Sequence, residues 1–292
     1  MSTTLAGPPS SCCWTGIKHT GTPEGRVELL GGLDTYISEP SAGATSGSHK
    51  KVLLFLSGIY GPVFINNKLL QDYFAAMGFI VLGPDYFFGT YAQDLPADQD
   101  RTAWGREALS KALEVFPKWF EVVKAKYGTE TTKYTAVGYC LGAPLVLDLA
   151  AEGSIAAGNA FRHRHQPFLP LNKHLVAGAI VHPAFLKEHH FEKIKRTFHH
   201  PPDPRLSREA YTTIPTGPVL ASCAEVDLLF PLEARRRAED ILVRNKSRYY
   251  FQVFSGVAHG FAVQGNPDVP HERWAQEESA RGIKEWFLQF SG

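Results

Sequence analysis

The stretch Val137-Gly-Tyr-Cys-Leu-Gly-Ala-Pro144 places a cysteine between two glycines, where a predicted strand at 133–138 gives way to a predicted helix at 141–152. A turn of the form G-x-nucleophile-x-G needs both glycines because its central residue is strained and the strand and helix backbones approach closely. A thiol that only filled space in the core would not require this pattern. The sequence therefore predicts that Cys140 projects as a nucleophile from the N-terminal end of a helix.

The rest of the chain alternates between apolar runs and amphipathic segments. The segment 26–40 has two short alternating runs joined by Gly31-Gly32, which predicts a hairpin at the edge of a sheet. Further strands are expected at 51–58, 79–87, 175–181, 217–222 and 248–254, and helices at 65–77, 103–126, 231–244 and 271–290. This alternation predicts an α/β fold, with a mostly parallel, doubly wound sheet and helices on both faces.

Changes in composition along the chain indicate how it is divided into a leader, a domain and loops. Residues 1–25 are expected to form an irregular leader, and 26–292 a single domain, because no repeat or long linker divides them. The segments near 84–105 and 183–215 are expected to be cap-like loops over the strand ends. The His-rich segment 163–200 lacks metal-ligand spacing on a helix, so it is interpreted as a solvated loop.

Charge and cysteine content limit the possible partners. Thirty basic and 29 acidic residues give a net charge of +1, which argues against a nucleic-acid or anionic-membrane binder and favours a small-molecule substrate. The chain has neither a signal-peptide pattern nor an apolar run long enough to span a membrane, so a cytoplasmic monomer or homodimer is expected. Its four cysteines do not form a disulfide framework, and Cys12 and Cys13 are interpreted as structural or incidental rather than metal-binding.

A nucleophilic thiol needs a base, and the base needs a carboxylate that orients it. Asp227 follows the strand expected at 217–222, and His259 follows the strand expected at 248–254. The carboxyl ends of parallel strands meet at one edge of a sheet, so Cys140, Asp227 and His259 are expected to converge there. Backbone N–H groups of Leu141 and Ile59 are the expected donors to an oxyanion.

These motifs give the chain a family resemblance. Gly138-Tyr-Cys-Leu-Gly142, Asp227 with Pro231 behind it, and His259-Gly-Phe261 resemble the dienelactone hydrolase family, most closely its fungal branch. The likeness extends to Gly83-Pro-Asp-Tyr86, His182-Pro-Ala-Phe185 and the leader Cys12-Cys13, and covers nearly the whole chain. The resemblance implies an α/β-hydrolase fold and a Cys-His-Asp triad that cleaves a lactone or related ester through an acyl-enzyme. It implies no metal or organic cofactor.

Two departures from the family pattern bear on the substrate. Gly58 stands where the family usually carries an acid that helps to activate the cysteine, and the segment after His259 lacks the arginine that holds a substrate carboxylate in bacterial members. A larger apolar or aromatic ligand, such as a polyketide-like lactone or thioester, is therefore favoured. Its contacts are expected to come from Gly58, Tyr60, Phe87, Trp104, His182 and Phe261, with Phe64, Tyr86, Phe88 and Tyr91 nearby.

Three functions remain open from the sequence. The first is a cysteine-dependent hydrolase of a lactone, ester or thioester. The second is a non-hydrolytic relative, a lyase, isomerase or cyclase in which His259 carries protons. The third is a catalytically silent binding protein that keeps the fold, a possibility left open by the missing acid at Gly58.

Overall fold

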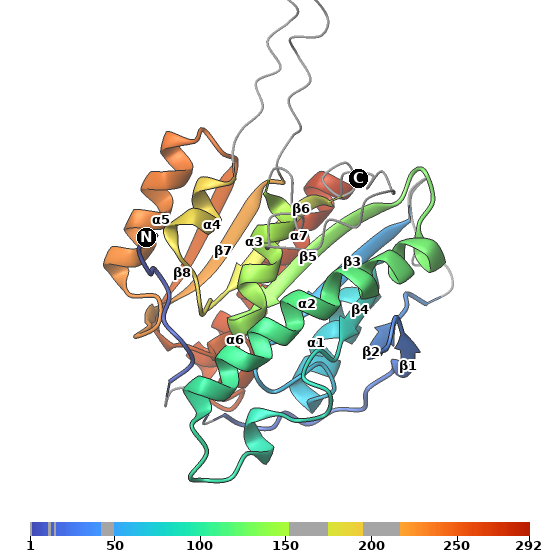
Figure 1. The fold of residues 1–292 in the computed structure, drawn as a ribbon, viewed down its shortest axis with the longest axis horizontal. Helices are drawn as coiled ribbons and strands as arrows, with labels where there is room; N and C mark the ends of the chain where they lie inside the picture. The colour runs from blue at the N-terminus through green and yellow to red at the C-terminus, as the bar shows by residue number, and fades with distance from the viewer. Residues whose placement is uncertain (1, 11–12, 15, 42–49, 152–174, 195–216) are drawn as a thin grey trace, which may run out of the picture.

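The structure is a computed structural model that describes residues 2–10, 13–14, 16–41, 50–151, 175–194 and 217–292. Within them, eight strands form one sheet in the order β1-β2-β4-β3-β5-β6-β7-β8 (Figure 1). The strands are β1 Arg26–Leu30, β2 Leu33–Ser38, β3 Lys51–Leu56, β4 Ile80–Pro84, β5 Lys133–Tyr139, β6 Leu175–Val181, β7 Val219–Val226 and β8 Tyr249–Ala258. The six strands β3 to β8 are parallel, and the hairpin β1–β2 is antiparallel at one edge.

Helices cover both faces of this sheet. They are α1 Ile65–Ala76, α2 Arg101–Tyr127, α3 Ala143–Ala150, α4 Glu188–Glu192, α5 Leu232–Arg244, α6 Phe261–Gln264 and α7 Pro270–Ser291, with short 3-10 turns η2 Ala92–Asp94 and η3 Cys140–Gly142. Alternate residues of β3 divide between two cores, because side chains of a strand point to opposite faces. Leu54 packs in the core under α2, α3 and α5, whereas Phe55 packs in the core under α1 and α7. The doubly wound α/β fold predicted from the sequence is confirmed.

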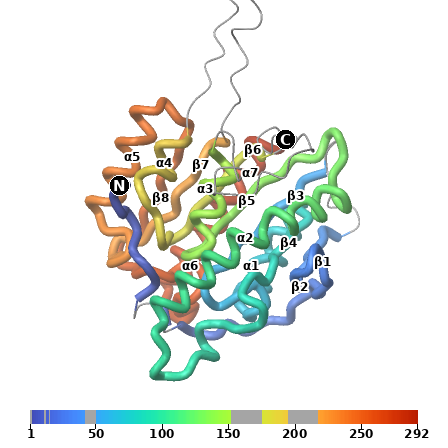
Figure 2. Tube along the Cα trace, in the orientation of Figure 1, coloured from blue at the N-terminus to red at the C-terminus, as the bar shows by residue number. Residues whose placement is uncertain are grey.

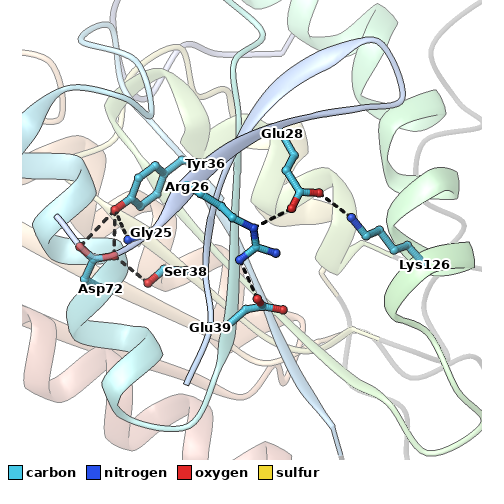
Figure 3. A network of polar contacts seen from close by, with 8 residues as sticks. All are labelled: Gly25, Arg26, Glu28, Tyr36, Ser38, Glu39, Asp72 and Lys126. Carbon is cyan, nitrogen blue, oxygen red and sulfur yellow. Dashed lines mark hydrogen bonds and ion pairs between the residues drawn. The ribbon is translucent and has the colours of Figure 1, made fainter. Parts of the chain in front are cut away.

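The edge hairpin is held to the body of the protein by polar contacts (Figure 3). The Tyr36 hydroxyl donates to the Asp72 carboxylate of α1 at 3.0 Å and accepts from the Gly25 N–H at 2.8 Å. On the other side of the hairpin, Glu28 forms ion pairs with Arg26 and with Lys126 of α2, each at 2.7 Å. Both helices therefore fix the strand that follows the leader.

The leader, residues 1–25, runs across the carboxyl ends of the parallel strands. Figure 2 shows its dark blue start beside α5, and its later part leads to β1 at the opposite edge of the sheet. Its backbone N–H groups donate to carbonyls that follow three successive strands: Leu5 to Leu186 after β6, Gly7 to Leu229 after β7, and Ile17 to Gln264 after β8. These bonds place the described part of the leader over the edge of the sheet where the motif residues lie.

Some expectations fall partly outside the described residues. The stretches 152–174 and 195–216, which hold about half of the His-rich segment 163–200 and most of the loop expected at 183–215, are among those not described. The segment 84–105, expected to be a loop, contains two pieces of regular structure, the 3-10 turn η2 and the first turn of α2. No helix in the described ranges is long and apolar enough to cross a membrane.

Candidate active site

The Cys140 turn lies between β5 and α3 and depends on both flanking glycines. Cys140 has a φ of 49°, in the left-handed region that a residue other than glycine seldom adopts. A Cβ atom on Gly138 would lie 2.4 Å from the Gly142 carbonyl oxygen, and one on Gly142 would lie 2.1 Å from the Leu56 carbonyl oxygen. Larger residues are therefore excluded by backbone on both sides. The turn holds Cys140 at the start of the η3–α3 helical segment.

Asp227 and His259 form a buried pair at the ends of β7 and β8. The His259 Nδ1 lies 2.9 Å from one carboxylate oxygen of Asp227 and 3.1 Å from the other. The second of these oxygens also accepts the N–H groups of Leu229 at 2.9 Å and Phe230 at 3.0 Å. Asp227 is thus at once a turn-forming residue and the residue that orients the imidazole, and its position is fixed by the backbone.

Three reactive side chains meet in front of this pair. The sulfur atoms of Cys140 and Cys13 and a ring nitrogen of His259 all lie within 4.8 Å of one another, and all three residues are buried. Because His259 Nδ1 is engaged by Asp227, we infer that Nε2 is the nitrogen that faces the sulfurs; it has no hydrogen-bond partner among the described residues. Cys13 comes from the leader, and no periodic pattern in the sequence predicts its position.

The site surrounds a small cavity of about 20 Å³, which is room for about one water molecule. Among the described residues, the ionisable side chains of its lining are two cysteines, two tyrosines and two histidines, and none is a Lys, Arg, Asp or Glu. The lining residues are Cys13, Gly58, Ile59, Tyr60, Asn67, Tyr139, Cys140, His182, His259, Gly260, Val263 and Gln264. In this conformation the cavity admits a reacting group but not a large ligand.

Protonation in the site is shaped by burial and by the close partners. Burial acts to lower the pKa of His259, but the Asp227 carboxylate and Cys13 outweigh it and raise that pKa to about 10. The interaction with Cys140, together with burial, raises the pKa of the Cys13 thiol well above its usual range. Burial acts to raise the pKa of Asp227, and the hydrogen bond to His259 outweighs it, so this pKa is lowered overall. The Asp227–His259 pair therefore favours a charged imidazolium.

Comparison with known proteins agrees with this fold. The model of the dienelactone hydrolase family matches residues 33–291. The chain belongs to the dienelactone hydrolase family. It is 34% identical to dienlactone hydrolase 1 of Gibberella moniliformis over 97% of this chain and 94% of that protein, and 28% identical to hydrolase pyvD of Aspergillus violaceofuscus over 97% of each. Among solved structures, esterase 2 of Thermogutta terrifontis with butyrate bound has the same fold, with a TM-score of 0.54 at 16% identity over 91% of this chain and 94% of that one.

This member of the family has an α/β-hydrolase fold and is a hydrolase of the dienelactone-hydrolase type. Its Gly58 lies against the cysteine, at the position where the sequence resemblance places an acid. A Cβ atom on Gly58 would be 3.1 Å from the Cys140 Cβ, which is tighter than most such contacts. An acidic side chain at this position would therefore contact the cysteine directly.

The expected oxyanion donors lie on two sides of the turn. Leu141 follows Cys140 at the start of the helical segment, and Ile59 lines the cavity from the turn after β3. The turn after β3 is braced, because the Gly61 N–H donates to the Gly58 carbonyl at 3.0 Å and the Tyr86 hydroxyl donates to the Ser57 carbonyl. The Ile59 backbone is therefore held at a fixed place near the sulfur.

His182 lies at the end of β6 and lines the cavity beside His259. The two imidazole centroids are 4.9 Å apart in an edge-to-face arrangement, and neither ring nitrogen of His182 has a hydrogen-bond partner among the described residues. Burial, and then the charge of His259, lower the pKa of His182 to about 3. His182 is thus a neutral ring that fixes the position of His259 by packing.

The structure differs from the sequence-based expectation for three aromatic side chains. Phe87 and Trp104 lie outside the cavity lining and stack on each other, with centroids 5.8 Å apart. Phe261 packs against Phe254 and the ring of His182 instead of lining the cavity. Residue type and spacing identify aromatic positions near a strand end, but they do not fix the direction of each ring. Of the expected contacts, Gly58, Tyr60 and His182 line the cavity.

Sequence reasoning missed several lining residues. Cys13 was treated as incidental, and Asn67, Tyr139 and Gln264 were not considered as part of the site. Cys13 is only 2% exposed, although it lies in a segment without regular secondary-structure pattern. Its burial depends on the hydrogen bonds that dock the leader on distant loops, and no local signal encodes them.

Proposed function

We propose that this protein is a cysteine-dependent hydrolase of a lactone, ester or thioester, with Cys140 as nucleophile, His259 as acid and base, and Asp227 as the residue that orients His259. One observation carries the proposal: a cysteine in a strained strand-to-helix turn lies with its sulfur within 4.8 Å of a buried histidine nitrogen, and an aspartate holds the other nitrogen. This is the arrangement of nucleophile, base and orienting acid that acyl transfer requires.

The reaction begins with proton transfer from the Cys140 thiol to His259. The raised pKa of His259 favours this transfer, because the imidazolium is stabilised by Asp227. The thiolate then attacks the substrate carbonyl, and the N–H groups of Leu141 and Ile59 stabilise the oxyanion. His259 gives its proton to the leaving oxygen or sulfur. A water molecule, deprotonated by His259, hydrolyses the thioester that remains on Cys140.

The cavity lining supports a substrate that is uncharged around the reacting carbonyl. No Lys, Arg, Asp or Glu side chain belongs to it, so it offers no partner for a substrate carboxylate. A cavity of about 20 Å³ holds only the reacting group. A larger apolar acyl group of the polyketide-like kind must therefore displace part of the lining. Tyr60, 8% exposed, is the more exposed of the two tyrosines that line the cavity.

Mass spectrometry of the intact protein tests the mechanism. With p-nitrophenyl butyrate, the protein should release nitrophenol and carry one butyryl group on Cys140, and His259→Ala should remove turnover. Cys223→Ala is the matched control, because Cys223 is a buried thiol of β7 outside the cavity lining. Its adduct and turnover should match those of the unmodified protein.

Two other results would each contradict this proposal and favour one of the two alternative functions. A stable adduct on Cys140 without turnover, on esters and thioesters alike, would favour the non-hydrolytic reading. Absence of any adduct, with a Cys140 that also fails to react with iodoacetamide, would favour a silent binding protein.

A further inference from the structure

Cys13 has no part in the proposed acyl transfer, yet the leader delivers its sulfur to the reacting atoms. The Cys13 Sγ, the Cys140 Sγ and a His259 nitrogen lie within 4.8 Å of one another. Cys13 is 2% exposed, Cys140 5% and His259 6%, so all three donors are screened from solvent. Two thiols and an imidazole that converge in a buried site form the donor set that a borderline-soft cation prefers.

The spacing of these donors suits a single ion. Zinc binds thiolate sulfur at about 2.3 Å and imidazole nitrogen at about 2.0 Å, so tetrahedral ligand atoms are about 3.3 to 3.8 Å apart. The upper limit of 4.8 Å here exceeds that range by about one ångström. Rotation of the two cysteine side chains about one bond each covers such a difference without movement of the backbone.

The histidine supplies an independent observation. The Nε2 of His259 is buried without a hydrogen-bond partner among the described residues, whereas its Nδ1 is held by Asp227 at 2.9 Å. A buried unpaired nitrogen carries a free-energy cost that a ligand would remove. Histidines that bind metals almost always give their other ring N–H to a carboxylate or carbonyl, as His259 does to Asp227.

We propose that Cys13, Cys140 and His259 bind one Zn²⁺ ion, or a cation of similar softness, with the fourth coordination position facing the cavity. On binding, the thiol proton of Cys13 and the proton shared between Cys140 and His259 leave to solvent, so that two thiolates balance the two positive charges of the ion and His259 Nε2 presents a lone pair to it. The small cavity has room for about one water molecule as fourth ligand. The ion occupies the sulfur that the acyl-enzyme needs, and it therefore inhibits hydrolysis reversibly.

Cobalt binding tests this site without reference to catalysis. Metal-free full-length protein titrated with Co²⁺ should show thiolate-to-cobalt charge-transfer absorption that saturates at one ion per chain and is displaced by Zn²⁺. Cys13→Ser and Cys140→Ser should each weaken binding at least about 100-fold, and Asp227→Asn about 10- to 100-fold through the orientation of His259. Cys223→Ala should bind as the unmodified protein does, because Cys223 lies outside the cavity lining.

Two results would overturn the proposal. Equal cobalt affinity in the Cys13→Ser variant would remove Cys13 from the site, and absorption without a thiolate band would indicate surface histidines instead. Serine is close to cysteine in size, and thermal unfolding of each variant shows that it is folded. The cobalt spectra do not depend on whether the protein forms a butyryl-enzyme. Failure of the hydrolase proposal and failure of the metal-site proposal can therefore be distinguished.

Discussion

The carbonyl oxygen of Leu56 lies 2.1 Å from the place that a Cβ atom on Gly142 would occupy. The end of β3 and the start of α3 are thus in backbone contact at this point. The same strand end leads into the turn that carries Gly58 and Ile59, so this contact sets the distance between the cysteine and the cavity wall opposite it.

Gly142→Ala should therefore destabilise the fold by about 3 kcal/mol or more, because backbone must move to admit the methyl group. Urea unfolding measures the loss. Gly105→Ala is the matched control, since a Cβ atom there meets nothing nearer than 3.5 Å and the residue is inside α2. It should be neutral or more stable by up to about 1 kcal/mol. Equal stability of Gly142→Ala and the unmodified protein would contradict the close approach.

Asp227→Asn should lower kcat for ester hydrolysis about 100- to 10,000-fold, because the amide no longer holds the imidazole in the reactive tautomer or stabilises its charge. The amide oxygen can still accept the Leu229 and Phe230 N–H groups, so the turn should persist. Steady-state kinetics with p-nitrophenyl butyrate and near-UV circular dichroism separate the two effects. A variant with unchanged kcat would show that Asp227 serves the turn alone.

Asn66→Ala should loosen the leader over the site. The Asn66 amide donates to the carbonyls of Ile17 and Val263 and accepts from the His19 N–H, so one buried side chain joins the leader to the segment after β8. Its loss leaves buried backbone groups unpaired, at about 1 to 3 kcal/mol each. Iodoacetamide should label Cys13 faster in this variant, as followed by peptide mapping.

The control for that experiment is Asn245→Ala. The Asn245 amide also donates to backbone carbonyls, those of Phe191, Glu192 and Ile194, but it has no contact with the leader. Its Cys13 labelling rate should equal that of the unmodified protein. If Cys13 were labelled as slowly in Asn66→Ala as in the unmodified protein, the leader would be held by its other contacts.

Histidine burial predicts a loss of stability in acid. Burial, followed by the charge of His189, lowers the pKa of His190 to about 3 from 6.5. Between these values the unfolded chain binds one more proton than the folded chain, so stability falls as the pH falls below about 6.5. His190→Asn keeps an acceptor for the Lys187 N–H and removes this proton linkage.

Urea unfolding at pH 7 and pH 5 measures the effect. From the higher to the lower pH, the unmodified protein should lose about 2 kcal/mol more than His190→Asn does. The buried His182, whose pKa is also lowered, remains in both proteins and cancels in the difference. An identical pH response of the two proteins would show that His190 is protonated in the folded state.

The strands along the chain, and the meeting of Cys140, Asp227 and His259 at their carboxyl ends, could be predicted from the sequence. Apolar runs predicted β3 to β8, and the parallel arrangement brought residues 140, 227 and 259 to one edge. The predicted elements are confirmed within a few residues: the last strand continues to Ala258 and the final helix begins at Pro270. Pro117 lies inside α2 without ending it.

The remaining part of the site could not be predicted, for two physical reasons. Side-chain direction depends on neighbours from other elements, so Phe87 and Trp104 stack on each other rather than line the cavity. The position of Cys13 depends on single backbone bonds from an irregular segment to loops about 170 to 250 residues away in sequence, such as Leu5 to Leu186 and Ile17 to Gln264. Neither the direction of a side chain nor the docking of the leader produces a periodic pattern in the sequence.

The path of the leader also determines when the site can form during biosynthesis. Leu5, Gly7 and Ile17 leave the ribosome well before Leu186, Leu229 and Gln264, whose carbonyls accept their backbone N–H groups. Contacts between such distant residues form late because closing a long loop costs entropy. While the chain is being synthesised, Cys13 is therefore exposed. Cys13 and Cys140 become neighbours only after β8 has joined the sheet.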